Sequence, residues 1–323
     1  MLNGNIDKMI SVIVPTYNGA DLLRKSLVTW AHQTLPTDQY EIIVVDNNST
    51  EDIQSVVEEV KKSRPNVRDI IRYVKETITG ATAARHRGVH ESRGEHLVFA
   101  DNDGLYNPEC LEEILKVYEG NMDCMAVACK IDIQWDGVEP DWIAPYKYLL
   151  GQLDYGDQVI YRQGLYLNGG LMSVRRDVFE RLHGFNPDLV GSYLIGDGDT
   201  GLVRKLHKEG LLVGWAPKAH MWHMQQVNKH GSVRGVALHC YNNGVADSYA
   251  KYREEDFHMR GNMWQYLMMK LLAVCKKWLQ SRVQHREDKS LYFAYRQQVG
   301  AVRFFTLLMN KELRKQIQVR DGY

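Results

Sequence analysis

The stretch HLVFADND, residues 96–103, determines the fold that we predict for this chain of 323 residues. Its small and apolar residues 97–100 come directly before Asp101, Asn102 and Asp103. A short apolar run bounded by turn residues is typical of a buried strand in a parallel sheet. Ligands of open α/β sheets bind beyond the carboxyl ends of such strands. The sequence therefore places two carboxylates where a ligand is expected.

The pair Asp101 and Asp103 is expected to need a cation, because two neighbouring carboxylates repel each other. Hard divalent cations keep several waters, take one or two carboxylates and bridge to substrate phosphates. The pattern Asp-x-Asp therefore predicts a clamp for a metal and a diphosphate. From these residues alone, the alternative is a solvated turn before a helix that starts near Pro108.

The composition is that of an ordinary soluble globular protein, with 44% hydrophobic and 25% charged residues. Forty Lys and Arg residues balance forty Asp and Glu residues, which argues against bulk binding of nucleic acid. The five scattered cysteines have no CxxC spacing and predict reduced thiols. No segment resembles a signal peptide or a membrane span. We expect a cytoplasmic protein, either free or peripheral at the membrane face.

Alternating strand and helix patterns over about the first hundred residues predict a doubly wound α/β sheet. The first strand is expected to stop at Pro15, and Ser49 is expected to cap the second helix with Asp52 three residues later. Asn107 and Pro108 are expected to start the fourth helix. The expected strands are residues 11–18, 41–49, 70–74 and the stretch that ends at Asp101, and the expected helices start near residues 20, 52, 80 and 108.

Six short motifs follow one another along the chain. They are PTYN at 15–18, VVDNNS at 44–49, ARHRG at 84–88, ADND at 100–103, NGG with a downstream arginine at 168–176, and GDGDTGLVRKL at 196–206. Their order resembles that of the family-2 glycosyltransferases over about residues 10–225. The resemblance implies the glycosyltransferase A fold, an α/β fold with a Rossmann-like, mainly parallel sheet. Two positions depart from the family's pattern, since Gly198 stands in place of a common Glu and His86 in place of a frequent Asn.

The resemblance also implies inverting transfer of a sugar from a nucleotide-sugar donor to a hydroxyl acceptor, in the synthesis of a polysaccharide or another glycoconjugate. Residues 1–230 would form the catalytic domain, with a nucleotide-binding half of about 1–120 and an acceptor half of about 121–230. Residues 134–166 are expected to be a long loop over the site. Residues 231–323 are expected to be a helical C-terminal extension.

The residues implied to bind the nucleotide sugar are Pro15, Tyr17, Asp46, Arg85, Asp101, Asn102 and Gly170. The Tyr17 ring can stack on a base, or it can pack beside Pro15, and the Asp46 carboxylate can accept from a base N–H or a ribose hydroxyl. Arg85 can neutralise the diphosphate, or it can be a helix-surface arginine. Gly170 can let the backbone approach the transferred sugar, with a tight turn as the alternative.

The metal implied by the resemblance is Mn²⁺ or Mg²⁺, held by Asp103. It would stabilise the leaving diphosphate as a Lewis acid. His223 follows a predicted strand and is expected to complete the site. A structural or surface role for His223 is the alternative, because the chain has 12 histidines.

Inversion requires one base to deprotonate the acceptor hydroxyl. Asp197 and Asp199 both stand at a predicted helix start, where capping and the helix dipole favour carboxylates in any case. The register of Leu202, Lys205 and Leu206 against the family's pattern assigns the base to Asp199. Asp197 would then be a neighbour of the base.

Residues 261–280, GNMWQYLMMKLLAVCKKWLQ, combine bulky apolar residues with Lys270, Lys276 and Lys277. Core packing or a homodimer face is one explanation. Peripheral docking on a membrane surface is the other, and a lipid-linked glycan acceptor would give such docking a purpose.

Two other functional classes are less consistent with these residues. A non-catalytic sugar-nucleotide-binding scaffold of the same fold is disfavoured by the joint presence of Asp46, Asp101, Asp103 and Asp199. A sugar-phosphate nucleotidyltransferase would need a glycine-rich phosphate loop after the first strand, and the chain has PTYNGAD there.

Overall fold

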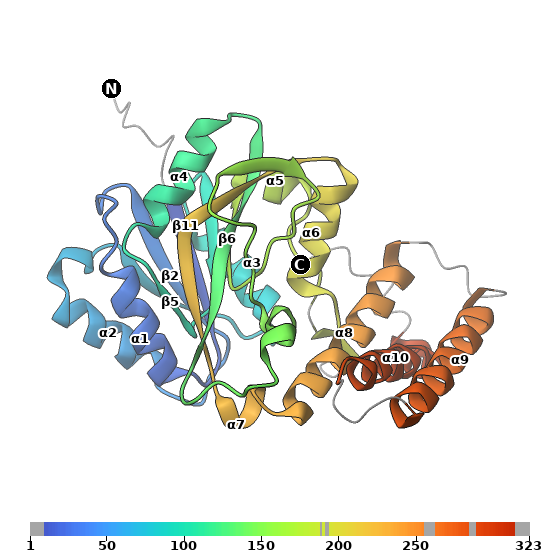
Figure 1. Cartoon of the computed structure of the whole chain (residues 1–323). Helices are drawn as coiled ribbons and strands as arrows, with labels where there is room; N and C mark the ends of the chain where they lie inside the picture. The colour runs from blue at the N-terminus through green and yellow to red at the C-terminus, as the bar shows by residue number, and fades with distance from the viewer. Residues whose placement is uncertain (1–9, 188, 191–193, 255–261, 284–288, 314–323) are drawn as a thin grey trace.

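The computed structural model describes residues 10–187, 189–190, 194–254, 262–283 and 289–313. Its N-terminal half contains four parallel strands in the spatial order β3-β2-β1-β4. The strands are β1 (Ile10–Thr16), β2 (Tyr40–Asp46), β3 (Ile71–Lys75) and β4 (His96–Ala100). Every residue of β1, β2 and β4 is buried, because helices cover both faces of the sheet (Figure 1). The predicted doubly wound α/β fold is confirmed.

The helices that link these strands are α1 (Ala20–Trp30), α2 (Ile53–Ser63) and α3 (Ala81–Glu91). Alternate residues of β1 point to opposite faces, so Val12 and Val14 pack with Leu23 and Leu27 of α1 while Ile13 packs on the α3 side. Gly88 lets α3 lie close to the sheet, since an added Cβ there would be 2.4 Å from the Ile13 side chain.

The sheet continues beyond β4 with strands from the second half of the chain. β8 (Leu171–Arg175) pairs antiparallel with β4 and with β6 (Cys124–Trp135), and β11 (Leu212–Gln225) pairs parallel with β6. β5 (Gly104–Tyr106) and β7 (Ile160–Gln163) pair antiparallel with β11. The other elements before the C-terminal helices are the 3₁₀ helix η1 (Pro65–Val67), α4 (Cys110–Gly120), the 3₁₀ helix η2 (Ala144–Leu150), α5 (Arg176–Arg181), β9 (Leu189–Val190), β10 (Leu194–Ile195) and α6 (Gly198–Lys208).

Several predicted boundaries were wrong. β1 runs through Pro15 to Thr16, because β1 pairs with β4 only over Ile10–Ile13 and the missing N–H falls beyond that ladder. Asp52 caps α2 by accepting from the Ser55 amide, at 3.0 Å.

Two further predictions also differ from the structure. Helix α4 begins at Cys110, two residues after Pro108. Residues 134–166 are less irregular than expected, since they contain η2, β7 and the end of β6.

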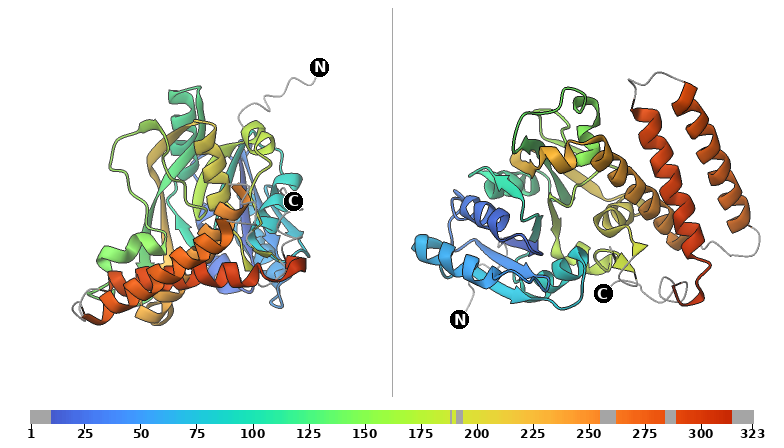
Figure 2. Two further views of the ribbon diagram at one scale, coloured as in Figure 1. Left: turned by 90° about the vertical axis from the view of Figure 1, so that its right-hand side faces the viewer. Right: turned by 90° about the horizontal axis from the view of Figure 1, so that it is seen from below.

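The C-terminal part consists of α7 (Val227–His230), α8 (Val233–Glu254), α9 (Asn262–Val283) and α10 (Ser290–Leu307). Helix α10 packs closely on α8, because Cβ atoms added at Gly244 and Gly300 would lie 1.9 and 2.0 Å from carbonyl oxygens of the facing helix. Helix α9 packs chiefly on α10 and lies outermost (Figure 2). The predicted helical extension is confirmed, while the domain boundary at residue 230 stays a prediction.

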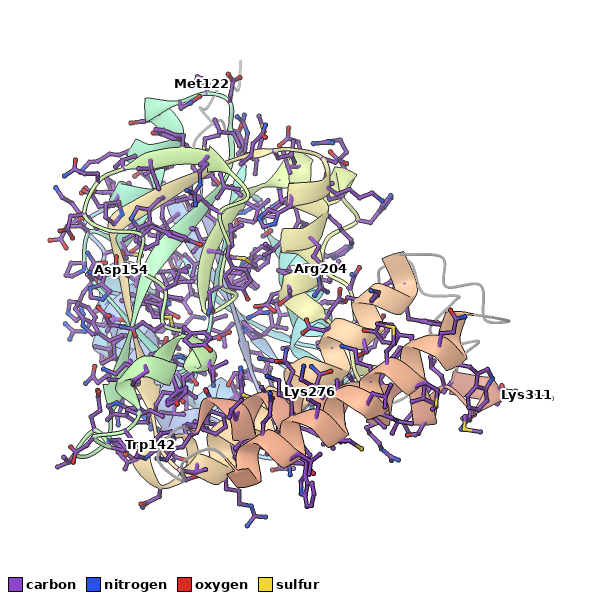
Figure 3. The ribbon with its side chains drawn as sticks, turned by 45° about the vertical axis from the view of Figure 1, so that its right-hand side comes forward. Met122, Trp142, Asp154, Arg204, Lys276 and Lys311 are labelled. Atoms are coloured by element: carbon purple, nitrogen blue, oxygen red, sulfur yellow. The ribbon has the colours of Figure 1, made fainter. Side chains whose placement is uncertain are left out.

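Helix α8 is tied to the sheet domain by an ion pair. The Arg204 guanidinium on α6 lies 3.1 Å from the Asp247 carboxylate on α8, at the junction seen in Figure 3. None of the helices in the described ranges has the length and apolar composition needed to cross a membrane.

Candidate active site

The site lies at the carboxyl end of β4, as the sequence predicts. Pairing of β4 with β8 brings the residues after β4 beside the turn at 168–170, which precedes β8. The Asp101 amide donates to the Gly170 carbonyl at 3.0 Å, and the Gly170 amide donates to the Asn168 side chain at 2.8 Å. Gly170 thus belongs to a tight turn that is fixed directly against Asp101.

Arg85 is buried, so the alternative of a helix-surface arginine is wrong. Its guanidinium donates to an Asp101 carboxylate oxygen at 2.7 Å and to the Gly169 carbonyl at 2.9 Å, and it lies 5.5 Å from the centre of the Phe185 ring. Burial raises the pKa of Asp101, the Arg85 charge opposes this shift, and nearby Asp103 adds to it. Arg85 therefore holds the Asp101 carboxylate in place.

The predicted metal ligands Asp103 and His223 face each other. Pairing of β5 with β11 aligns Gly104 with His223, and the Asp103 Oδ2 atom lies 3.4 Å from His223 Nε2. Burial lowers the pKa of His223, but the hydrogen bond and charge of Asp103 outweigh it, so the net pKa shift is upward. The alternative of a surface His223 is wrong.

These two residues fit a divalent cation. The Asp103 Oδ1 atom is buried and has no hydrogen-bond partner among the described residues, so it is available as a ligand. His223 is hydrogen-bonded to the Leu150 backbone, and its Nε2 atom lies 2.7 Å from the Gln225 amide nitrogen. The Leu150 contact orients the ring, and a metal on Nε2 would take the place that the Gln225 amide has at that nitrogen.

Protein ligands alone would not complete such a site. In the described part of the chain, no three His, Cys, Asp or Glu side chains come together in an arrangement that could hold an ion. Two protein ligands suit a cation that keeps waters and takes phosphate oxygens of a substrate.

Asp199 and Asp197 differ sharply in their surroundings. The Asp199 carboxylate accepts from the Gly169 amide and from its neighbour Thr200, both at 2.9 Å. Asp197 is buried and accepts from the Asn186 amide at 3.1 Å and from Arg204 at 3.3 Å. Asp197 is the N-cap residue of α6 but makes no side-chain capping bond, so capping by its carboxylate, the alternative explanation, does not account for it. The ion pair with Arg204 links the start of α6 to a later turn of the same helix, and the Asn186 bond links it to the segment before α6.

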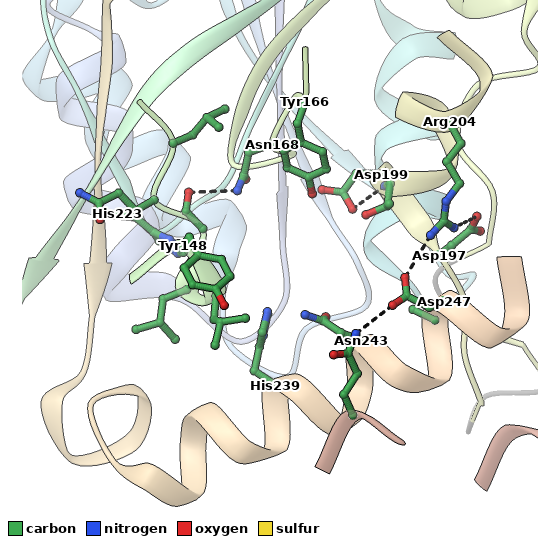
Figure 4. A pocket seen from close by; sticks show the side chains of 18 residues that line it. Tyr148, Tyr166, Asn168, Asp197, Asp199, Arg204, His223, His239, Asn243 and Asp247 are labelled. Carbon is green, nitrogen blue, oxygen red and sulfur yellow. Dashed lines mark hydrogen bonds and ion pairs between the residues drawn. The ribbon is translucent and has the colours of Figure 1, made fainter. Parts of the chain in front are cut away.

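A cavity of about 550 Å³ lies between His223, a candidate metal ligand, and the helix α6 (Figure 4). His223 and Asn168 line one side, Tyr166 and Asp199 line another, and helix α8 closes it. The α8 residues that line it are His239, Asn243, Ala246 and Asp247, joined by Gln297 of α10. Sequence reasoning missed these α8 and α10 residues, because no local motif marks them.

The predicted nucleotide end of the site lies at the ends of β1 and β2. Tyr17 is 62% exposed, whereas Pro15 is buried within β1, so Tyr17 is largely open to solvent. Asp46 is buried and accepts from the Ser49 amide and the Tyr73 hydroxyl, both at 2.8 Å. Burial raises the pKa of Tyr73 to about 12, and the hydrogen bond and charge of Asp46 add to this shift.

Asn102 connects β4 to the loop after β1. Its side-chain amide donates to the Thr16 hydroxyl at 2.9 Å, and an added Cβ at Gly19 would lie 2.4 Å from the same amide nitrogen. The turn after β4 and the loop after β1 are therefore held together, next to the exposed Tyr17. The nucleotide contacts of these residues stay predictions.

A mixed α/β sheet with acidic residues after β4 and a facing turn before β8 is the glycosyltransferase A architecture. Residues 11–183 match the model of glycosyl transferase family 2, which is more than half of the chain. The chain therefore belongs to glycosyl transferase family 2.

Individual curated relatives match over shorter stretches. A poly(ribitol-phosphate) beta-glucosyltransferase of Bacillus spizizenii is 35% identical over 102 residues, which cover 32% of this chain and 16% of that protein. The poly(ribitol-phosphate) beta-N-acetylglucosaminyltransferase TarP of Staphylococcus aureus is 29% identical over 107 residues, 33% of this chain and 32% of TarP. The chain thus matches about a third or less of the length of these relatives.

Solved structures resemble the chain over nearly its whole length. The mannosyltransferase PcManGT from Pyrobaculum calidifontis, in complex with GDP-Man and Mn²⁺, has a TM-score of 0.61 at 20% identity, covering 91% of this chain and 86% of PcManGT. The S. aureus TarS fragment 1–349 in complex with UDP-GlcNAc has a TM-score of 0.54 at 16% identity, covering 97% and 95%. At these identities the similarity establishes the shared fold alone.

Proposed function

We propose that this protein is an inverting, divalent-metal-dependent glycosyltransferase. It transfers a sugar from a nucleotide-sugar donor to a hydroxyl of a glycan or lipid-linked acceptor, in the synthesis of a polysaccharide or another glycoconjugate. The observation that carries the proposal is the cavity that His223 and Asp199 share. It places a candidate metal ligand and a candidate base on opposite sides of one space large enough for a sugar.

The donor lies along the ends of β1, β2 and β4. Tyr17 stacks on the base, and Asp46 with Asp101 and Asn102 provides polar contacts for the nucleoside. Arg85 positions Asp101, because its guanidinium is already bonded to that carboxylate and to the Gly169 carbonyl. The GDP-Man bound in PcManGT supports a nucleotide-sugar donor.

Asp103 and His223 would hold a divalent cation, Mn²⁺ or Mg²⁺. When bound, such a cation supplies positive charge to the departing diphosphate. The orphaned Asp103 oxygen and the orientation of His223 are the features of this chain that support it. The Mn²⁺ in PcManGT agrees with a metal of this class.

Asp199 acts as the base. Backbone amides of Gly169 and Thr200 hold its carboxylate at the cavity wall, so one carboxylate oxygen can take the proton of an acceptor hydroxyl. The acceptor oxygen then bonds to the anomeric carbon while the bond from that carbon to the diphosphate oxygen breaks on the other face. Attack opposite to the leaving group inverts the configuration.

The acceptor occupies the part of the cavity between Tyr148, Tyr166 and helix α8. Aromatic faces beside amide, imidazole and carboxylate groups suit the alternating apolar and hydroxyl faces of a sugar. All five cysteines of the chain are free and four are buried, which supports a reducing compartment such as the cytoplasm.

The decisive experiment compares Asp199→Asn with Asp197→Asn, using hydrolysis or transfer of nucleotide sugars in the presence of Mn²⁺. Asparagine keeps the shape of Asp199 and one acceptor oxygen but cannot take the proton. We expect the rate of Asp199→Asn to fall about a hundredfold or more while donor binding survives. Asp197→Asn should lower the melting temperature, since it weakens a buried ion pair, and should keep a substantial rate.

The same experiment can refute the proposal. A nearly full rate in Asp199→Asn with a dead but folded Asp197→Asn would move the base to Asp197. Donor binding without any turnover by the native protein, over a broad panel of donors and acceptors, would favour the non-catalytic scaffold.

A further inference from the structure

Helix α9 has an exposed apolar face that its packing within the chain does not use. We name this face the outer stripe. Its members are separated by three, four or seven residues, so they lie on one side of the helix. They are Trp264, Met268, Leu271, Leu272, Trp278 and Leu279, with exposed fractions of 37–66%.

The other side of α9 packs within the chain. Tyr266 and Leu267 pack against the buried cluster of α8 and α10, and the Tyr266 ring centre lies 4.7 Å from that of Phe305. This contact confirms the packing explanation for one face of α9. The outer stripe is a second apolar face of α9. Packing on α10 needs only one apolar face, so it does not explain the outer stripe.

The charges of the two outermost helices are all positive. Helix α9 has four basic residues and no Asp or Glu, and α10 has Arg296 and Arg303 and again no Asp or Glu. The whole chain, in contrast, has equal numbers of acidic and basic residues. Lys276 follows Leu272 by one turn and therefore borders the outer stripe.

This charge distribution selects the kind of partner. Two copies of α9 placed stripe against stripe would bring like charges together, which opposes a homodimer through this face. An anionic lipid surface attracts Lys and Arg, accepts Leu and Met side chains, and favours Trp at its interface.

We propose that the outer stripe of α9 docks this protein on the surface of an anionic lipid bilayer, lying in the interface without crossing it. Helix α9, which carries the stripe, packs on α10, and α10 with α8 forms part of the cavity wall. Docking through α9 would therefore hold α8, α10 and the cavity close to the lipid. Figures 2 and 3 show α9 beside α10 at the outside of the molecule. The inference does not depend on the proposed reaction, because lipid contact needs neither donor nor base.

The test is sedimentation of the full chain with vesicles, without nucleotide sugar. One set of vesicles is pure phosphatidylcholine, and the other contains equal parts of phosphatidylcholine and phosphatidylglycerol. The stripe variant is M268Q/L272Q/L279Q, whose three positions are 55–66% exposed, so the fold should be retained. The matched control is M122Q/V138Q, which changes exposed apolar residues on the sheet domain, 73% and 88% exposed. Circular dichroism and the elution volume of each variant are recorded.

We expect the native chain and the control to sediment with anionic vesicles and to bind neutral ones much more weakly. The stripe variant should stay in the supernatant with both. Replacing Lys276 and Lys277 by Gln should weaken binding to anionic vesicles about fivefold for each charge removed, and raising the salt should weaken it in the same direction.

Two results would overturn the proposal. One is a native chain that does not sediment with anionic vesicles and elutes as a dimer that the stripe variant dissociates, which would assign the stripe to a second copy. The other is equal sedimentation of the native chain and a folded stripe variant, which would place any lipid contact elsewhere.

Discussion

The proposed donor and acceptor sides of the site are built in different ways. On the proposed donor side, Asp101, Asp103 and His223 are placed by backbone pairing, because β4 pairs with β8 and β5 pairs with β11. On the acceptor side, Asn243 and Asp247 are placed by the docking of a whole helix. The register of paired strands determines which residues lie opposite each other. The position of a docked helix depends instead on contacts between residues that are far apart in the sequence. Changes on the donor side should therefore abolish function, and changes on the acceptor side should adjust it.

The largest effect is expected for Asp103→Ala. Loss of the carboxylate should weaken Mn²⁺-dependent binding of a nucleoside diphosphate by more than about a hundredfold, since loss of even a supporting group at a metal site costs about 10–100-fold. Isothermal titration calorimetry with and without Mn²⁺ measures this change. Asp157→Ala is the control, because Asp157 is exposed and outside the cavity lining. Equal Mn²⁺-dependent affinity in both variants would remove Asp103 from the metal site.

The second-largest effect is expected for Gly169→Ala, because the Gly169 amide binds the Asp199 carboxylate. A Cβ atom added at Gly169 would lie 2.2 Å from Asp199 Oδ2, so Gly169→Ala must displace the carboxylate. Misplacing a reacting group by about 1 Å can cost a hundredfold in rate. We expect kcat to fall by about 10–100-fold at saturating donor, while the affinity for nucleoside diphosphate with Mn²⁺ is kept.

Gly137→Ala is the matched control for Gly169→Ala. Its new Cβ atom would meet nothing closer than a Val227 methyl group at 3.5 Å, an ordinary contact. If Gly169→Ala and Gly137→Ala turn over at the same rate, the position of Asp199 does not limit the reaction.

A third effect concerns the scaffold beneath the donor side. His96 begins β4, at the end opposite Asp101, and its ring stacks on Tyr118 with centres 4.3 Å apart. Burial, aided by Arg175, lowers the pKa of His96 to about 4. Between pH 6.5 and 4 the unfolded chain takes up a proton that the folded chain does not, so stability falls as the pH falls through this window.

His96→Phe keeps the stacked ring and cannot take the proton. On going from pH 7 to 4.5, the native chain should lose about 2 kcal/mol more unfolding free energy than this variant. Urea unfolding at the two pH values measures the difference. His90→Phe serves as the control, since the His90 side chain is 81% exposed. Equal acid losses in the native chain and His96→Phe would contradict the burial argument.

The sequence predicted where Asp101 and Asp103 lie in the fold, because the signals for their position are local. An apolar run followed by Asp101 and Asp103 fixes both a strand and the edge where it ends. Arg85 was left with two interpretations, and contacts with Gly169 and Phe185, far away in the sequence, decided between them. The surroundings of Asp197 could not be predicted for the same reason, since Asn186 and Arg204 meet it only in the folded chain.

The acceptor side was not predictable from local patterns. Asn243 and Asp247 reach the cavity because α8 is held between the sheet domain and α10. The α8–α10 contact depends on Gly244 and Gly300, which are more than fifty residues apart. A glycine within a helical sequence does not indicate which other helix will pack against it.

The smallest effect is expected at Asn243, and it separates the two sides most directly. Asn243 lines the cavity from α8, whereas its neighbour Asn242 does not, although both belong to the same turn of the helix. Asn243→Ala removes amide groups that can bond an acceptor hydroxyl, and a net hydrogen bond is worth about 1 kcal/mol. The KM for the acceptor should therefore rise about fivefold, with kcat at saturating acceptor and the affinity for donor unchanged.

Asn242→Ala is the same substitution in the same helix and changes helix propensity equally. Because Asn242 does not line the cavity, this variant should leave the acceptor KM unchanged. Steady-state kinetics at varied acceptor concentrations distinguish the two variants. If Asn243→Ala instead lowers kcat as strongly as Gly169→Ala does, α8 takes part in positioning the reacting groups. The division between a donor side set by strand register and an acceptor side set by helix docking would then fail.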